Sequence, residues 1–210
     1  MISEQLLDRG IQDARVMAVM NRIPRERFLS AEYRSDAYTD RALPIECGQT
    51  ISQPYIVALM TQALELTGKE RVLEIGAGSG YQAAVLAELA QAVVTIERHA
   101  WLARHAADRL ALLGYQNVRV VEGDGTKGYP DEAPFDRIVV TAATEQVPPA
   151  LWDQLAEGGL MVIPIGKRES QTLQAIRKTN GQPNVHNLCP CRFVPLVADQ
   201  PLTALAPKVQ

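Results

Sequence analysis

The chain has 210 residues, of which 47% are hydrophobic and 21% are charged, and its formal net charge is −3. This composition is typical of one soluble globular domain, and so small a charge gives no general attraction to nucleic acid or anionic membranes. No apolar run reaches the roughly 18 residues that span a bilayer, and the N-terminus lacks the basic-then-apolar order of a signal peptide. We therefore expect a cytoplasmic, monomeric single domain over 1–210, with neither nucleic acid nor a membrane as a partner.

The first fifty residues differ from the rest of the chain. Residues 3–20 have apolar side chains at helical spacing, which predicts an amphipathic helix. The next stretch, RIPRERFLSAEYRSDAYTDRALPIECGQT, is polar and aperiodic, so we expect short helices and loops that lie over a surface. We call residues 1–53 the N-terminal cover.

From residue 54 onward, predicted helices and strands alternate. Helices are expected over 55–66, 81–90 and 99–113, and a fourth is opened by Pro148-Pro149 and closed by Gly158-Gly159. Strands are expected at 71–75, 92–97, 118–125, 135–143 and 160–166, with two more in a β-rich C-terminal end at 172–179 and 186–197. Pro164 predicts that 160–166 lies near a sheet edge or a bulge, because proline cannot donate to a strand ladder.

This order predicts an α/β fold with a doubly wound, mostly parallel sheet and helices on both faces. Continuous apolar strands joined by helices are typical of parallel sheets that are covered on both sides. Such sheets bind ligands beyond the carboxyl ends of their strands, where the winding reverses. The loops after residues 75, 97, 121 and 141 are therefore the expected ligand-binding loops.

The cysteines and histidines give no sign of a metal site or of a disulfide framework. Three cysteines are an odd number, and Cys189-Pro190-Cys191 has C-x-C spacing rather than the C-x-x-C of zinc and thioredoxin sites. No two of the three histidines have the i, i+4 spacing that places zinc ligands on one helix face. We expect no bound metal, and we expect Cys189 and Cys191 to be ordinary thiols on a strand near the surface.

The first ligand-binding loop reads EIGAGSGYQ and contains Gly76, Gly78 and Gly80 between a strand and a helix. Glycine lets the backbone turn sharply and lets a ligand approach it without a Cβ in the way. A tight turn that binds nothing would have the same pattern, so the loop alone leaves both interpretations open.

Two acidic residues come after the next two strands. Glu97 comes 21 residues after Gly76, a position from which a carboxylate can accept two hydrogen bonds from a ribose diol. Asp124, between two glycines, is placed to accept from the exocyclic amine of adenine. Each acid alone could be a solvated strand end or a turn residue. At successive strand ends of one sheet, and together with the glycine loop, they indicate a ligand that contains a nucleoside.

The spacing of the glycines selects among such ligands. A dinucleotide loop reads G-x-G-x-x-G, whereas here the third glycine comes one residue earlier. Over roughly residues 70–165 the chain resembles the S-adenosylmethionine-dependent methyltransferases, which implies S-adenosylmethionine as the cofactor and S-adenosylhomocysteine as its product. This cofactor carries a cationic ammonium and a sulfonium, and an acid at the entry of the loop, Glu74, suits a cation better than a phosphate.

Several longer stretches narrow the resemblance to one family. They are PIECGQTISQPYIVALMTQAL, VLEIGAGSGYQAAVLAEL, GDGTKGYPDEAPFDRIVVTAA, LAEGGLMVIPIG, RVMAVMNRIPRERFL, DAYTDRALPI and RFVPLV. Together they resemble the protein-L-isoaspartate (D-aspartate) O-methyltransferases over about residues 3–197. The TISQP run, joined to an aromatic residue and an apolar helix, is the part that is specific to this family.

The resemblance implies an enzyme that methylates the free α-carboxylate of L-isoaspartyl residues in damaged peptides and proteins, and by the family's description D-aspartyl residues as well. It implies a Rossmann-like methyltransferase sheet that binds S-adenosylmethionine within 54–197 and a peptide cleft formed in part by the N-terminal cover. The segment 198–210 has no counterpart in the family, and we expect it to be a flexible tail.

The resemblance also implies roles for particular residues. Ser52 matches the active-site serine, and the substrate is expected to contact Thr50, Ile51, Ser52 and Gln53. The residues expected around the cofactor are Glu46, Cys47, Gly48, Gln49, Gly76, Gly78, Ser79, Gly80, Glu97, Arg98, Asp124 and Gly125. The chain departs from the family pattern at Glu46 and Cys47, where relatives commonly have glycine and an aromatic residue or histidine.

Ser52 precedes a helix with Pro54 in its first turn, which is typical of a helix cap. The family implies that the same hydroxyl faces the reacting groups. No histidine and acid stand in a recognisable relation to activate Ser52, so we expect it to align the substrate carboxylate by a hydrogen bond rather than to act as a nucleophile. Three alternatives remain open: a methyltransferase for a small-molecule carboxylate, a nicotinamide-dependent oxidoreductase, and a cofactor-binding protein without activity.

Overall fold

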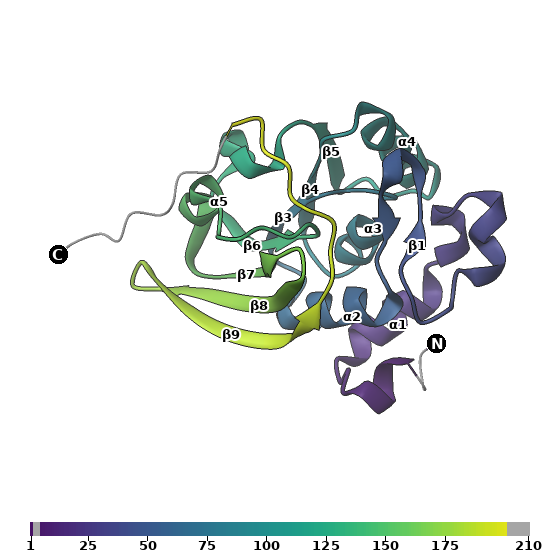
Figure 1. Cartoon of the computed structure of the whole chain (residues 1–210), viewed down its shortest axis with the longest axis horizontal. Helices are drawn as coiled ribbons and strands as arrows, with labels where there is room; N and C mark the ends of the chain where they lie inside the picture. Colours follow the sequence, from purple (N-terminus) through teal and green to yellow (C-terminus); the bar gives the residue numbers. More distant parts are fainter. Residues whose placement is uncertain (2–4, 201–210) are drawn as a thin grey trace.

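The computed structural model describes residues 1 and 5–200, and a seven-stranded sheet forms its centre (Figure 1). The strand order is β5-β4-β3-β6-β7-β8-β9, in which β5 to β7 are parallel to one another and β8 and β9 are antiparallel. Because β4 lies on one side of β3 and β6 on the other, the winding reverses at β3, and the predicted doubly wound sheet is confirmed. The strands are β3 (Arg71–Ile75), β4 (Ala92–Glu97), β5 (Val118–Glu122), β6 (Phe135–Val140), β7 (Leu155–Lys167), β8 (Ser170–Thr179) and β9 (Gln182–Cys191).

Helices cover both faces of the sheet because successive side chains of its apolar strands point to opposite sides. Val72 belongs to one hydrophobic cluster with the buried residues of α1, α2 and α3, whereas its neighbour Leu73 belongs to a second cluster with Leu151 of α5. The helices are α1 (Ala14–Arg22), α2 (Pro54–Ala63), α3 (Tyr81–Ala87), α4 (Ala100–Leu112) and α5 (Pro149–Gln154), with two 3-10 turns after β5, η6 (Gly125–Lys127) and η7 (Pro130–Glu132). Within the described part of the chain, no helix has the length and apolarity needed to cross a membrane.

The N-terminal cover consists of short elements, as predicted, but residues 3–20 do not form one helix. Gly10, with φ 87°, ends the first 3-10 helix, and α1 begins anew after Asp13, whose carboxylate accepts the backbone N–H groups of Arg15 and Val16. These local contacts interrupt a pattern whose apolar spacing is continuous; residues 3 and 4 of that predicted helix lie outside the described residues. The short elements are η2 (Leu7–Arg9), η3 (Arg25–Phe28), η4 (Ala31–Asp36), β1 (Leu43–Pro44), η5 (Glu46–Gly48) and β2 (Thr50–Ile51).

One prediction around β7 was wrong, and a second was right only in part. Helix α5 ends at Gln154 and β7 begins directly after it, so that Gly158-Gly159 lie inside the strand, where its register with β6 is irregular. The strand with Pro164 was expected near an edge or a bulge: β7 is not an edge, because it lies between β6 and β8, but its register with β6 is irregular directly before residue 160. The neighbouring strand β6 has already ended at Val140 when Pro164 is reached, so the missing N–H of the proline interrupts no ladder with β6.

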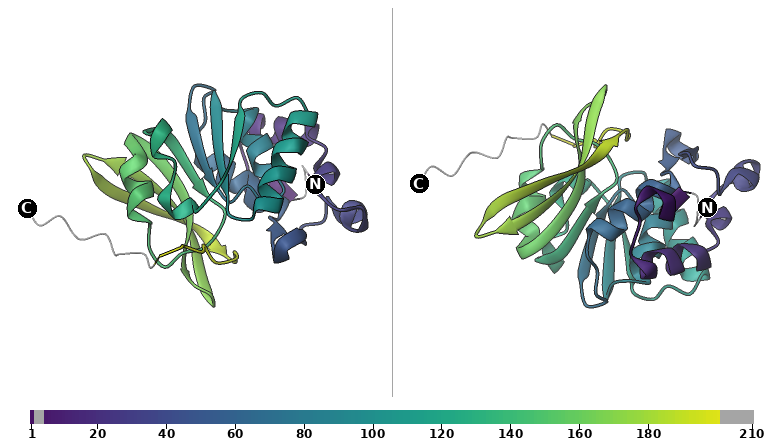
Figure 2. Two further views of the ribbon diagram at one scale, coloured as in Figure 1. Left: turned by 90° about the horizontal axis from the view of Figure 1, so that it is seen from above. Right: turned by 90° about the horizontal axis from the view of Figure 1, so that it is seen from below.

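The C-terminal end is β-rich, as predicted, and its last described segment returns to the sheet. Strands β8 and β9 form a long twisted hairpin on the side of the molecule away from the N-terminal cover (Figure 2). Residues 192–199 then cross the carboxyl ends of the parallel strands (yellow in Figure 1): the N–H of Ala143 donates to the Val194 carbonyl at 2.8 Å, and the Asp199 N–H donates to Asp124 at 2.9 Å. Of the segment predicted as a flexible tail, 198–200 is described, and 201–210 lies outside the described residues.

Candidate active site

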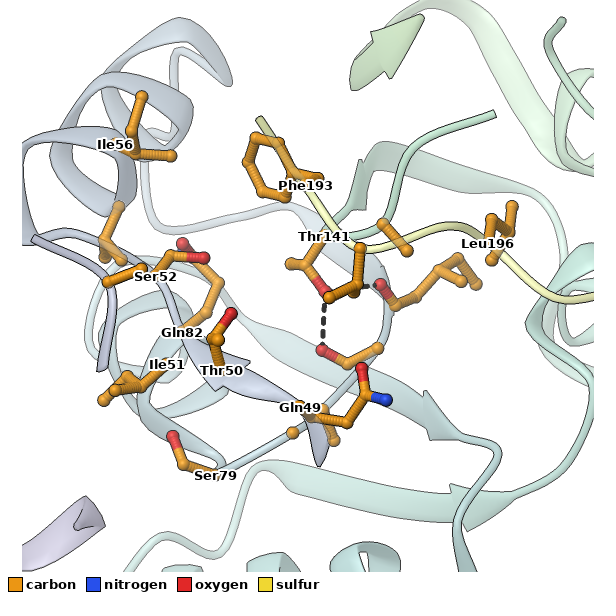
Figure 3. Close-up of a pocket in the computed structure, with 18 of the residues that line it drawn as sticks. Gln49, Thr50, Ile51, Ser52, Ile56, Ser79, Gln82, Thr141, Phe193 and Leu196 are labelled. Atoms are coloured by element: carbon orange, nitrogen blue, oxygen red, sulfur yellow. Dashed lines mark hydrogen bonds between the residues drawn. The ribbon is translucent and has the colours of Figure 1, made fainter. Parts of the chain in front are cut away.

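One cavity of about 640 Å³ lies over the carboxyl ends of β3, β4 and β6, where the winding reverses. Two predicted segments meet in it (Figure 3). We call the part lined by 76–79 with Glu97 and Arg98 the glycine-loop end, and the part lined by 50–53 with Tyr55 and Ile56 the serine end. Residues 189–197 close one side, and Figure 3 shows Phe193 across the opening from Ile56. The volume falls within the range of small-molecule sites, about 300–1,000 Å³.

The glycine loop has the sharp turn that its composition predicts. The φ angles of Gly76, Gly78 and Gly80 are 95°, 53° and 86°, all in the region that favours glycine. A Cβ at Gly76 would lie 2.3 Å from Oγ1 of Thr141, whose hydroxyl bonds to the carbonyls of Ile75 and Gly76 at 2.9 and 2.8 Å (Figure 3). Gly76 and Gly78 line the cavity, whereas Gly80 precedes the first turn of α3 and does not.

Glu97 joins the glycine loop to the end of β4. Its Oε2 accepts the N–H of Gly78 at 2.8 Å, and its Oε1 accepts the N–H of His99 at 2.9 Å. The side chain lines the cavity although Glu97 is only 5% exposed. Because each carboxylate oxygen has a second lone pair, both can still accept a hydroxyl of a bound ligand. The predicted contact with a ribose diol is compatible with this geometry.

Both carboxylate oxygens of Asp124 accept hydrogen bonds from other groups of the protein. Its Oδ1 accepts the N–H and the hydroxyl of Thr126 at 2.9 and 2.7 Å, and its Oδ2 accepts the N–H of Asp199 at 2.9 Å. Burial raises the pKa of the Asp124 carboxyl, but the hydrogen bonds from Asp199 and Thr126 outweigh it, so the pKa lies below its usual range. Asp124 does not line the cavity; its neighbour Gly125 and Arg98 do.

Glu74 was expected to face the ligand at the entry of the glycine loop, but the structure buries it in the interior. It is 0% exposed, it does not line the cavity, and no well-formed hydrogen bond from a described group reaches either carboxyl oxygen. Burial raises its pKa to about 8; the adjacent Thr95 lowers it and the charge of Glu97 raises it further. Glu74 is therefore mostly protonated at neutral pH, and it is wrong to regard it as a charged partner of a cationic ligand.

The serine end differs from its expected helix-cap geometry. Gln53, not Ser52, occupies the N-cap position of α2, and its side chain makes no capping hydrogen bond. Ser52 lines the cavity one residue earlier, and its carbonyl accepts Nη2 of Arg25 at 2.7 Å. The four residues predicted to contact substrate all line this end: Thr50, Ile51, Ser52 and Gln53. Since Ser52 does not cap the helix, its hydroxyl is available to a ligand.

The segment before the serine end contains a left-handed turn. Cys47 has φ 57° and Gly48 has φ 66°, so the backbone freedom that glycine provides is required at Cys47 rather than at Glu46. Glu46, Cys47 and Gly48 are exposed and do not line the cavity, whereas Gln49 does, with Nε2 3.5 Å from Nε2 of His99. The three exposed residues therefore shape the approach to the cavity rather than its wall.

Sequence reasoning missed several residues of the wall. His99, Thr141 and Ala142 lie in or beside the loops after residues 97 and 141, which were expected to bind a ligand, although these residues were not singled out. Arg9 and residues 189–197 carry no such signal, because only the folded chain brings them to the cavity. Cys189 and Cys191 are free thiols on the edge strand β9, as predicted, where they are partly buried in this wall; burial raises the pKa of both thiols, that of Cys191 to about 11.

The fold and the site together define an S-adenosylmethionine-dependent methyltransferase: a doubly wound sheet, a glycine loop without dinucleotide spacing, and an acid at the end of the next strand. The cavity fits that cofactor, because the backbone of Gly76 and Gly78 lies open to it and Glu97 offers two acceptors. No cluster of potential metal ligands occurs among residues 1 and 5–200.

Comparisons with known proteins give the family. The model of the family "Protein-L-isoaspartate(D-aspartate) O-methyltransferase (PCMT)" matches residues 1–201. A protein-L-isoaspartate O-methyltransferase of Koribacter versatilis is 54% identical over 200 residues, which is 95% of this chain and 90% of the relative, and one of Methanoculleus marisnigri is 52% identical over 94% and 90%. The chain belongs to the protein-L-isoaspartate (D-aspartate) O-methyltransferase family, and it is an enzyme that uses S-adenosylmethionine.

Solved structures agree with this assignment. A structure described as a protein-L-isoaspartate O-methyltransferase superposes with a TM-score of 0.85 and 31% identity, over 95% of this chain and 67% of the other. A Plasmodium falciparum structure, described as a putative enzyme of the same kind in complex with S-adenosyl-L-homocysteine, has a TM-score of 0.80 and 27% identity, over 93% of this chain and 96% of the other. The predicted Rossmann-like methyltransferase fold is thus confirmed.

Proposed function

We propose that this enzyme methylates the free α-carboxylate of L-isoaspartyl residues in damaged peptides and proteins, and that Ser52 aligns that carboxylate. The observation that carries the proposal is the shared cavity in which the glycine-loop end and the serine end meet. A cofactor held at one end and a peptide held at the other would bring methyl group and carboxylate together. The family relationship supports the choice of substrate.

The cofactor end of this proposal rests on groups that the cavity exposes. Gly76, Gly78 and Ser79 present their backbone, Glu97 presents two oxygens to a diol, and Gln49, Arg98 and Gly125 complete the wall. We also propose that Asp124 receives the adenine amine, for which its contact with Asp199 would have to give way. Glu46, Cys47, Gly48 and Gly80 would act through backbone shape, since none of these residues lines the cavity.

The chemistry asks little of the protein beyond alignment and exclusion of water. When bound, S-adenosylmethionine would supply a methyl group activated by its sulfonium: a C–O bond to the carboxylate would form as the C–S bond breaks, leaving a neutral thioether. A carboxylate is ionised at neutral pH, so no general base is needed. The Ser52 hydroxyl would donate one hydrogen bond to the carboxylate and fix the attacking oxygen in line with the methyl group.

The product explains how methylation repairs a protein. A methyl ester reacts with nucleophiles more readily than a carboxylate, because methanol leaves more easily than oxide, and the next backbone amide nitrogen can displace methanol to form a succinimide. Hydrolysis of the ring opens it to aspartate or isoaspartate. Repeated cycles deplete the isoaspartate, while the enzyme itself forms only the ester.

The test is transfer of labelled methyl from S-adenosylmethionine to an isoaspartyl peptide, beside its normal aspartyl twin. We expect transfer to the first peptide only. Ser52→Ala should lower turnover about 100-fold, the usual loss for one aligned donor, while S-adenosylhomocysteine binds unchanged. Ser30→Ala, at an exposed serine without a capping bond, is the matched control and should behave as wild type. Equal methylation of both peptides, or a covalent adduct on Ser52, would contradict the proposal.

A further inference from the structure

Arg25 is the largest fully buried side chain of the described residues, and it stands directly behind the serine end. It lies in η3 of the N-terminal cover and is 0% exposed. Its Nη2 donates to the carbonyl of Ser52 at 2.7 Å, and its Nε donates to the carbonyl of Ala37 at 2.8 Å. One side chain thus ties the backbone of Ser52 to two separate parts of the N-terminal cover.

The guanidinium of Arg25 is a buried cation without an anionic partner. Within the described part of the chain no carboxylate forms an ion pair with it, and its remaining atom Nη1 makes no well-formed hydrogen bond, although the Tyr81 hydroxyl lies near enough to raise the pKa of Arg25. The ring of Tyr81 lies 4.7 Å from the guanidinium carbon and is its other close neighbour. Burial lowers the pKa of Arg25, but an arginine stays charged at neutral pH because its ordinary pKa is so high.

Such an arrangement lowers the free energy of unfolding, so a role in the neighbouring site would explain why the charge is there. Removing a charge from water without a counter-charge costs several kcal/mol, which is why buried arginines are usually paired. Ser52 and Tyr81, the residues that Arg25 contacts, both line the cavity. An anion placed against the Ser52 hydroxyl would therefore lie beside the residue whose carbonyl this unneutralised positive charge contacts.

We propose that Arg25 is a positioning residue for methyl transfer: it fixes the backbone of Ser52, and its charge favours a carboxylate over a neutral group at the serine end. This inference rests on the proposed role of Ser52. The charge gives a physical reason for choosing an acid over a neutral amide, whereas the choice between isoaspartyl and aspartyl peptides, which both carry a carboxylate, would depend on where the fixed backbone of Ser52 places that group. The charge of Arg25 offsets part of the cost of removing that carboxylate from water.

The test compares two peptides of one sequence, one with isoaspartate and one with isoasparagine, which has a carboxamide in place of the reacting carboxylate. Their affinities are measured by calorimetry with S-adenosylhomocysteine present, and the ratio of the two is the readout. Arg25→Lys keeps the charge, whereas Arg25→Gln keeps a donor without the charge. We expect the preference for the carboxylate to survive in the lysine variant and to fall at least about tenfold in the glutamine variant.

Two controls separate this charge effect from loss of structure. Arg22→Gln makes the same change on the exposed end of α1, where the arginine pairs with Glu88, and should leave the ratio unchanged. Affinity for S-adenosylhomocysteine should stay within about twofold in every Arg25 variant, because the glycine-loop end does not contact Arg25. A glutamine variant that loses both peptides equally, or a wild-type enzyme without preference for the carboxylate, would overturn the proposal.

The proposed role of Ser52 is tested separately, by the turnover of Ser52→Ala. Normal turnover of Ser52→Ala would refute the proposed role of the hydroxyl, whatever the Arg25 variants do. If the glutamine variant does not fold, the lysine variant decides through the split of kcat and KM on the isoaspartyl peptide. A retained carboxylate preference with a lowered kcat supports the inference, because lysine keeps the charge but cannot bond to the carbonyls of Ala37 and Ser52 in the way that the planar guanidinium does. Loss of the preference refutes the inference.

Discussion

The two ends of the cavity are built from different kinds of structure. At the glycine-loop end, residues 76–79 and Glu97 lie at the ends of strands β3 and β4, whose positions are fixed by the parallel ladder. At the serine end, Ser52 lies in an irregular segment that is held by Arg25 and by the bond from Gln53 Nε2 to the Asp40 carbonyl at 3.0 Å. One end is fixed by local geometry, and the other by contacts between residues far apart in the sequence.

This difference predicts that the glycine-loop end controls cofactor affinity and that the serine end controls peptide kinetics. A loop on a rigid sheet can hold a cofactor that is the same in every turnover. A segment tied by a few side chains can adjust to peptides that differ in sequence. If this comparison is right, substitutions at the glycine-loop end should change cofactor affinity, and substitutions at the serine end should change peptide kinetics with cofactor affinity intact.

The largest effect is expected for Gly76→Ala. Its φ of 95° disfavours alanine, and the new Cβ would meet Oγ1 of Thr141 at 2.3 Å. Affinity for S-adenosylhomocysteine should fall at least about 100-fold, measured by calorimetry. Gly114→Ala is the matched control, since it has φ 88° with nothing near its Cβ; it should cost about 1 kcal/mol of stability and leave binding unchanged.

Glu74→Gln should change the pH dependence of folding. The pKa of Glu74 is about 8 in the folded chain, against an ordinary value of 4.5, so between these pH values the folded state holds a proton that the unfolded state has lost. The wild type should therefore lose stability as pH rises from about 5 to about 8, by on the order of 3 kcal/mol relative to the glutamine variant. Urea unfolding of both proteins across this range checks it, and parallel curves would contradict it.

Glu97→Gln should lower the affinity for S-adenosylhomocysteine about tenfold, because an amide nitrogen would replace one of the two oxygens that accept the N–H groups of Gly78 and His99. Calorimetry measures this affinity. Glu122→Gln is the control, since Glu122 is the register partner of Glu97 on β5 but is exposed and does not line the cavity. Equal losses in the two variants would show that the strand end, rather than the carboxylate, determines binding.

Gln53→Ala tests the serine end. Without the bond to the Asp40 carbonyl, the KM for an isoaspartyl peptide should rise about threefold to tenfold, the usual worth of one partly exposed hydrogen bond. Affinity for S-adenosylhomocysteine should not change. A loss of cofactor affinity as large as that of the Glu97 variant would break the comparison between the two ends.

The smallest effect is expected for Asp199→Asn. The carboxylate of Asp199 pairs with Arg98 at 2.9 Å and Lys127 at 3.0 Å, but all three side chains are well exposed. Exposed ion pairs are weak because water and salt screen them, so cofactor affinity should change less than about threefold, and high salt should reduce the difference. A larger change would mean that residues 192–199 belong to the glycine-loop end.

The predicted site residues whose location at the cavity followed from the sequence are those in which a strand fixes the position of the loop at its carboxyl end. The glycines after β3 and Glu97 at the end of β4 could be placed because strand ends of a parallel sheet share one edge. Glu74 could not, since a strand residue faces either the ligand or the interior according to its register in the sheet. The break at Gly10 was missed because apolar spacing continues across it.

The sequence by itself determined the doubly wound sheet, the glycine loop and the family, since each depends on periodicity, local turns and short motifs. Only the tertiary structure decided that Arg25 lies behind Ser52, that residues 192–199 cross the strand ends, and that Gln53 takes the cap position. Those features depend on contacts between residues distant in the chain, and the energies of such contacts depend on burial and distance, which no local pattern records.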